Sequence, residues 1–175
     1  MIACKADHRK TTRLWSIRFL DTPRSDIYEL MIEQHHQDPT TMGPVDVVIA
    51  DWIADKIPYT DRIDQARCIA FRHKQTKKIV YGGAFNEHRG RDIQYHAACT
   101  DPRVLTKGRI ELLFWYGFMV FNTARISCVV AKSNKRSQKV VEGLGWKREG
   151  LIREFYAADD DAILYGMLRN ECKWI

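Results

Sequence analysis

The chain has 175 residues, of which 45% are hydrophobic and 29% charged, and its formal net charge at neutral pH is +6. This length favours one domain, and the dispersed positive charge, without a long basic run, suits phosphate-bearing ligands better than specific nucleic-acid binding. The five cysteines form no CxxC pair and no apolar window reaches the ~20 residues of a membrane helix, so we expect no disulfide framework, zinc knuckle or membrane span, and a cytoplasmic location.

The first third of the chain predicts one strand and two helices. Alternating residues at 12–21 indicate a strand. A helix is expected at 25–37, capped by Ser25, with Ile27, Leu30 and Met31 on its buried face. A second helix is expected at 46–57, with Val48, Trp52 and Ile53 on one face and Pro58 as its stop.

Residues 66–100 read as an antiparallel meander of three strands, at 66–73, 78–88 and 92–100, separated by polar turns. The pair Gly82-Gly83 within the second strand indicates a bulge or a close backbone approach. In the third strand Tyr95 and His96 are adjacent, so their side chains must lie on opposite faces of the sheet. The one that faces the helices belongs to the core, and the other is available to a cleft.

The last part of the chain alternates helices and strands. A polar loop at 101–108 leads into an apolar helix at 109–122, a buried strand at 124–132, a helix from Asn134 to Leu144, and two strands at 145–157 and 161–170. The expected order is therefore β-α-α-β-β-β-α-β-α-β-β. It predicts a mixed α/β (α+β) domain around a single, mostly antiparallel sheet.

A motif with defined spacing surrounds the second of these helices. Asn134 and Ser137 open it as Asn-x-x-Ser, and a Leu-Gly-Trp triplet, Glu-Gly and an Ile-Arg pair follow at 144–146, 149–150 and 152–153. A terminal strand with Asp161, Tyr165 and Leu168 completes the pattern. From residue 67 to residue 174 the chain resembles the GCN5-related N-acetyltransferase (GNAT) superfamily, and within it the RimJ/RimL-type ribosomal-protein N-terminal acetyltransferases.

The resemblance implies a GNAT fold over residues 1–175, with acceptor-side elements at 1–65 and a CoA-binding core at 66–175. It implies that the strands at 92–100 and 124–132 separate into a wedge for acetyl-CoA, and that the loop before the helix at 109–122 holds the pyrophosphate. Thr106 replaces the central glycine of the family's phosphate loop. The cofactor-binding residues expected on this basis are Ala97, Ala98, Cys99, Arg103, Val104, Leu105, Thr106, Lys107, Gly108, Arg109 and Asn134.

The resemblance also suggests catalytic candidates. Ser137 matches the serine that protonates the leaving thiolate, while the tyrosine acid of many relatives is replaced here by Val141. Tyr156 occupies the position of a carboxylate base in some RimJ/RimL enzymes, with Glu154 beside it. The general base therefore stays open among Glu87, His96 and Glu154.

Each signal has a plainer interpretation. Asn134 is also a good helix N-cap, and the basic loop at 103–109 can be a solvated connection. His35 and His36, near Glu33 and Asp38, suggest a metal, but successive helical side chains point about 100° apart, so no metal is predicted.

Three hypotheses follow. The first is an acetyltransferase that acts on an amine acceptor, either a protein N-terminus or a small molecule, and that is compatible with a homodimer. The second is a catalytically silent GNAT-fold structural or interaction protein, and the third is a nucleic-acid-modifying acyltransferase, motivated only by the charge.

Overall fold

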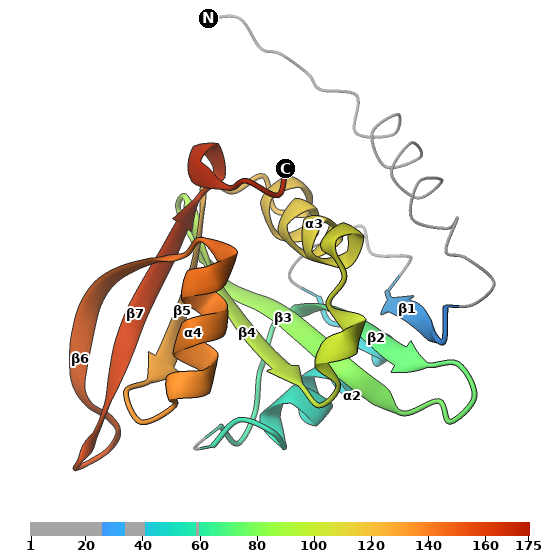
Figure 1. Cartoon of the computed structure of the whole chain (residues 1–175), viewed down its shortest axis with the longest axis horizontal. Helices are drawn as coiled ribbons and strands as arrows, with labels where there is room; N and C mark the ends of the chain where they lie inside the picture. The colour runs from blue at the N-terminus through green and yellow to red at the C-terminus, as the bar shows by residue number, and fades with distance from the viewer. Residues whose placement is uncertain (1–25, 34–40, 59) are drawn as a thin grey trace, which may run out of the picture.

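The computed structural model describes residues 26–33, 41–58 and 60–175 (Figure 1). Its core is a seven-stranded sheet in the order β1-β2-β3-β4-β5-β7-β6. Only β4 and β5 run parallel, and every other neighbouring pair is antiparallel. The predicted single mixed sheet is therefore confirmed, whereas the strand expected at 12–21 lies outside the described residues.

The elements follow the expected order from α2 onwards. They are β1 (Tyr28–Ile32), α2 (Pro44–Ala54), β2 (Arg67–His73), β3 (Ile79–Arg89), β4 (Asp92–Cys99), α3 (Lys107–Trp115), a π-helical turn (Tyr116–Val120), β5 (Arg125–Ala131), α4 (Lys135–Leu144), β6 (Lys147–Ala157) and β7 (Asp160–Leu168). Short 3₁₀ turns at Pro102–Val104 and Arg169–Glu171 precede α3 and follow β7.

The helix expected at 25–37 is wrong where the structure describes it, because Tyr28–Ile32 forms strand β1. This strand pairs antiparallel with β2, from Tyr28 opposite His73 to Ile32 opposite Ile69. Ile27 and Leu30, expected inside, are 46% and 40% exposed. The backbone of β2 offers an unpaired edge, and hydrogen bonding along that edge outweighs the helical spacing of the apolar residues.

Helix α2 matches the second predicted helix, with a different buried face. Ile49 and Ile53 are fully buried, but Val48 is 55% exposed. The buried face of α2 differs from the predicted one because Asp46 is also buried. Its carboxylate accepts hydrogen bonds from the backbone N–H groups of Gly43 (3.1 Å) and Cys68 (2.8 Å). Asp46 therefore both caps the helix and ties it to β2.

The sheet has two covered faces. Helices α3 and α4 pack on one face, over the central strands, and α2 packs on the other face, over β2 and β3 (Figure 1). The glycine pair of β3 permits close approach on both sides: a Cβ at Gly82 would lie 2.9 Å from Ile53, and one at Gly83 would lie 2.7 Å from the Tyr95 hydroxyl. The close-approach interpretation is thus confirmed, and the register shift of β3 against β4 falls between Asn86 and Arg89 instead.

The described part of the chain contains four cysteines, and none of them forms a disulfide in this structure. Cys68, Cys128 and Cys172 are free and buried, and Cys99 is free and exposed. Within the same residues, no helix has both the length and the apolar character that a bilayer crossing requires.

Candidate active site

Strands β4 and β5 separate in the middle of the sheet. They pair only at Asp92–Arg125, Ile93–Ile126 and Gln94–Ser127. Beyond these pairs β4 continues to Cys99 and β5 to Ala131 without a further β4–β5 pair in the described structure. Backbone groups along the two inner edges therefore lack ladder partners, and the predicted wedge is present.

Exposure along β4 shows where the wedge opens. Ile93, Tyr95, Ala97 and Cys99 share one face of the sheet by strand alternation. Ile93 is buried, whereas Ala97 and Cys99 are exposed although they lie on a central strand. Such exposure in the interior of a sheet leaves room for a ligand that covers the strand.

The floor of the wedge is aromatic. The rings of Tyr95 and Trp146 stack with centroids 6.2 Å apart and planes 14° apart. Gly145, with φ of 101°, ends α4 in a left-handed conformation that only glycine adopts readily, and this turn directs Trp146 under the wedge. The Gly145-Trp146 pair therefore brings an aromatic ring from the C-terminal half of the sheet into contact with β4, at the point where β4 and β5 separate.

The loop before α3 differs from the expected phosphate site in its side chains. The Arg103 guanidinium donates to both carboxylate oxygens of Asp101, at 2.8 Å each. Arg109 is buried, where it pairs with Asp26 and donates to the Val104 carbonyl (3.0 Å). The Arg109 guanidinium is thus engaged inside the protein in this structure, and the buried Val104 side chain belongs to the core.

The start of α3 keeps the features of an anion site. Thr106 is the N-cap residue, and its side chain makes no capping hydrogen bond. The N–H groups of Lys107 and Gly108 belong to the first helical turn, which has no intrahelical acceptors. The Lys107 side chain is 83% exposed and lies 3.9 Å from the Glu111 carboxylate, so its charge at this helix end is partly paired.

The opposite wall is formed by the start of α4. The Asn134 Oδ1 atom accepts a hydrogen bond from the Ser137 N–H (3.0 Å), which is the N-cap geometry of the plainer interpretation. No described residue hydrogen-bonds the Ser137 hydroxyl. Gln138, which sequence reasoning missed, donates from Nε2 to the carbonyls of Ala131 (2.9 Å) and Lys132 (2.8 Å) and fixes the end of β5 to this helix.

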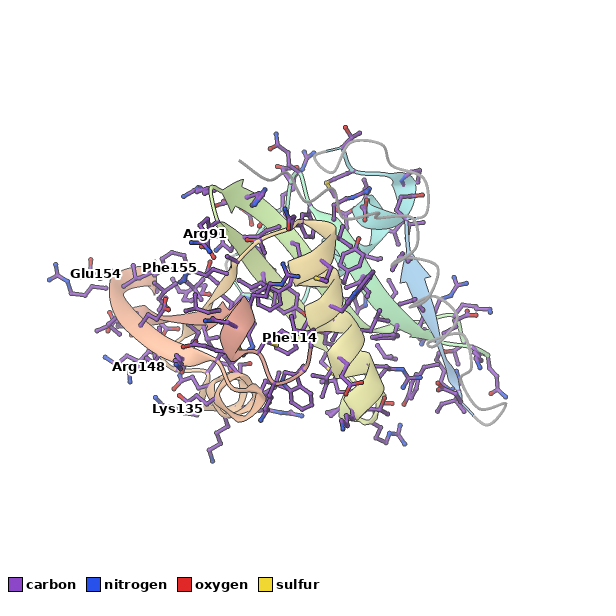
Figure 2. The ribbon with its side chains drawn as sticks, turned by 90° about the horizontal axis from the view of Figure 1, so that it is seen from above. Arg91, Phe114, Lys135, Arg148, Glu154 and Phe155 are labelled. Carbon is purple, nitrogen blue, oxygen red and sulfur yellow. The ribbon has the colours of Figure 1, made fainter. Side chains whose placement is uncertain are left out.

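The two walls face one another across the wedge. Although Cys99 is exposed as a residue, partial burial of its thiol raises the thiol pKa, and the positive charge of Arg136 on the first turn of α4 opposes that rise. This coupling places a cationic helix turn opposite the exposed end of β4. Figure 2 shows the neighbouring Lys135 extending outward from α4, with Phe114 packed between α3 and the strands.

On the other face of β4, His96 lies two residues beyond the last β4–β5 pair. Its Nε2 atom is 3.1 Å from Asn86 Oδ1, and the Asn86 amide nitrogen donates to the Asp64 carbonyl (3.4 Å). Burial lowers the pKa of His96, and the negative charge of Glu87 only partly offsets this effect. The imidazole is therefore neutral at pH 7.

The Asn86 contacts favour one tautomer of His96. An amide oxygen can only accept, so Nε2 carries the hydrogen and donates it to Oδ1. If the Asn86 side-chain amide were flipped, its Oδ1 atom would face the Asp64 carbonyl oxygen, and neither oxygen can donate a hydrogen bond. The lone pair consequently lies on Nδ1, which has no hydrogen-bond partner among the described residues. This arrangement suits a proton acceptor.

The other predicted candidates occupy different places. Glu87 is exposed in a left-handed conformation and pairs with Arg89 (2.7 Å). Glu154 lies at the outer end of β6, away from the wedge (Figure 2). The Tyr156 hydroxyl donates to the Val129 carbonyl of β5 (3.4 Å), and burial raises its pKa. Tyr156 is therefore close to the wedge, but as a weak acid and not as a base.

No set of three potential metal-ligating side chains occurs together in the described part of the chain. His35, His36 and Asp38 lie outside that part. Glu33, their neighbour, accepts a hydrogen bond from the Val45 N–H (3.1 Å) at the start of α2.

Comparisons with known proteins agree with this geometry. No protein-family model and no curated protein matches the sequence. The ribosomal-protein-S5-alanine acetyltransferase of Vibrio fischeri is similar in structure, with 15% identity, a TM-score of 0.57, and coverage of 85% of this chain and 96% of that one. A variant of spermidine N-acetyltransferase SpeG from Vibrio cholerae has 18% identity, a TM-score of 0.53, and coverage of 63% and 67%. The fold is that of the GNAT acetyltransferases.

Proposed function

We propose that the protein is an N-acetyltransferase that uses acetyl-CoA to acetylate a primary amine. The observation that supports this most directly is the separation of β4 and β5 after Gln94 and Ser127. Leaving two central strands unpaired sacrifices ladder hydrogen bonds, and a ligand with amide groups along its length can replace them.

The chain offers each part of acetyl-CoA a complementary surface. The inner edge of β4 from Tyr95 to Cys99 would pair with the pantetheine amides. The N–H groups of Lys107 and Gly108, with the Thr106 hydroxyl, would hold the pyrophosphate, because a helix N-terminus attracts anions. The bound thioester supplies an already activated acetyl group.

Acyl transfer further requires a neutral amine and a stabilised oxyanion. In the proposed mechanism Nδ1 of His96 accepts a proton from the incoming ammonium, directly or through water. A backbone N–H on the inner edge of β4, between Ala97 and Cys99, would donate to the developing oxyanion. His96 and Ala97 are consecutive residues, about 3.3 Å apart along the strand; the backbone N–H groups lie at the edge of the sheet, whereas the His96 side chain lies on one of its faces.

The departing thiolate needs a proton from the opposite wall. The Ser137 hydroxyl, which is free among the described residues, would supply it, with Tyr156 as the alternative donor. Replacement of Ser137 by alanine is expected to lower kcat about 10–100-fold while the Kd for CoA changes less than twofold. Steady-state kinetics with calorimetric titration of CoA checks this, and Ser133→Ala is the matched control. An unchanged kcat in Ser137→Ala would transfer the role to Tyr156.

The acceptor is proposed to approach the face of the sheet that bears His96. The comparison proteins are named for acetylation of a ribosomal protein and of spermidine. We therefore propose either a protein N-terminus or a small amine for this chain. A panel of both, assayed for CoA release, identifies the class.

Binding of acetyl-CoA is expected to raise the melting temperature. At about 100 times its Kd the ligand adds roughly 2.7 kcal/mol to the free energy of unfolding. A matched variant, Ala97→Trp, fills the wedge at an exposed position and should melt like the unliganded wild type but lose the shift. Absence of a shift in the wild type would instead favour the catalytically silent GNAT-fold protein. The ion pairs of Arg103 with Asp101 and of Arg109 with Asp26 are also compatible with that alternative.

A further inference from the structure

A second recess lies at the paired end of β4 and β5, opposite the wedge. Its volume is about 1120 Å³. Three segments that are distant in sequence build its walls: the β3–β4 turn at Arg91, the end of α3 with the following loop at 115–125, and the end of β7 at 168–170. Figure 2 shows Arg91 on this turn. The recess shares no residue with the proposed acetyl-CoA site.

The walls are fixed to one another by backbone hydrogen bonds. The Arg91 carbonyl accepts from the N–H groups of Ala124 (3.1 Å) and Arg125 (3.0 Å) and from the Thr123 hydroxyl. The Ala124 carbonyl accepts from the Arg169 N–H (2.9 Å). The recess is thus preformed, as ligand pockets usually are.

The side chains that line this recess carry a net positive charge. They include three arginines and no Asp or Glu, and the last residue of the chain, Ile175, also lines the recess. Arg125 is neutralised by Glu149 and Asp92. Arg91 and Arg169 make no ion pair with any described residue.

The contacts of Arg169 are unusual for a guanidinium. The side chain is partly buried, and its Nη2 atom contacts the thioether sulfur of Met119. Thioether sulfur is a weak acceptor, so the group loses water without gaining a strong partner. An oxyanion would satisfy it, because guanidinium binds carboxylate and phosphate oxygens in bidentate geometry.

We propose that this recess is a binding site for an organic oxyanion, a carboxylate or phosphate head group on an apolar body. Arg169 and Arg91 bind the head group. The side chains of Asn122 and Asn170, both exposed and without hydrogen-bond partners among the described residues, add polar contacts at the rim. Trp115, Met119 and Leu168 receive the apolar body.

The test uses 4-phenylbutyrate as the probe, with 4-phenylbutanol as its neutral analogue and inorganic phosphate as the bare head group. Titrations of ¹⁵N-labelled full-length protein are followed by NMR. We expect saturable shifts for the Trp115 indole N–H and the amides at 91, 122–125 and 169–170 with phenylbutyrate, weaker shifts with phosphate, and none with phenylbutanol. The two anions separate the contribution of the head group from that of the apolar body.

Variants assign the site. Arg169→Gln and Arg91→Gln should each weaken phenylbutyrate binding about 10–100-fold, the range for hydrogen bonds to a charged group. Arg153→Gln removes an exposed arginine on β6 and should leave binding unchanged. Because Arg91 is exposed, its variant stays informative even if Arg169→Gln impairs folding. Absence of saturable shifts, equal binding of phenylbutanol, or unchanged affinity in both arginine variants would overturn the proposal, whatever the outcome for acetyl-CoA.

Discussion

Replacement of His96 by glutamine is expected to lower kcat/KM by about 10²–10⁴-fold, the range for loss of a general base. Glutamine keeps a donor toward Asn86 Oδ1 and a similar volume, so the fold should persist. It cannot accept a proton at neutral pH. The measurement is steady-state kinetics with the best amine of the acceptor panel, together with calorimetric titration of CoA, whose Kd should stay unchanged.

The pH dependence gives a sharper test of the same role. Burial lowers the pKa of His96 below the ordinary value of 6.5, so the basic form predominates at neutral pH. The profile of kcat/KM should fall as pH drops through this lowered pKa, with a midpoint below 6.5. That acidic limb should be absent in His96→Gln. If kcat/KM falls at low pH with the same midpoint in both proteins, the decrease belongs to another titrating group.

Asn86 acts on the reaction through His96, so it is a positioning residue. Asn86→Asp places a carboxylate at the Nε2–H group and stabilises the imidazolium, which raises the pKa of His96 and moves the acidic limb to higher pH. The charged neighbour that also acts on this histidine is Glu87, which pairs with Arg89. Asn86→Leu removes the hydrogen-bond acceptor of His96, so both neutral tautomers of the ring should then be populated.

The ¹⁵N chemical shifts of the His96 ring report the tautomer and the pKa without any assay of activity. In the wild type Nε2 should carry the hydrogen, and in Asn86→Leu the two tautomers should mix. A wild-type ring protonated on Nδ1 would contradict the hydrogen-bond assignment and, with it, the proposed base.

The second half of the fold could be predicted because its signals are local. Alternation defines the strands of the meander, and Asn134 and Gly145 are capping residues that mark the ends of α4. The separation of β4 from β5 was expected only through the family resemblance. Register has no local signature, so the sequence cannot show that pairing stops at Gln94.

What the local sequence does not show depends on contacts between distant segments. Residues 28–32 have helical spacing, yet the free edge of β2 takes them as a strand. Arg109 stands in a basic loop, and nothing in the local sequence shows that Asp26, 83 positions earlier, will pair with it. His96 was one candidate among several, because the amide of Asn86 reaches it only through the β3–β4 register.

Arg109 carries the second large expected effect, on stability. Its side chain is 10% exposed and that of Asp26 14% exposed, and the guanidinium also lies 5.2 Å from the ring centroids of both Tyr28 and Phe71. Arg109→Met keeps the aliphatic packing but leaves the Asp26 carboxylate without its countercharge. Removal of one partner from a buried pair costs about 3–5 kcal/mol. Urea unfolding should show a loss of this size.

Two further variants separate this account from the phosphate-ligand role first expected for the residue. Arg103→Met breaks a pair whose arginine is 80% exposed, and should cost at most about 1 kcal/mol. The double variant Arg109→Met with Asp26→Asn removes the orphaned charge, and should recover part of the loss. Because the pKa of Asp26 is lowered in the folded protein, the wild-type pair stabilises fully above the ordinary carboxyl pKa of 3.8 and less as pH falls through the lowered value. Wild-type stability in Arg109→Met, combined with a large loss of CoA affinity, would return Arg109 to the phosphate site.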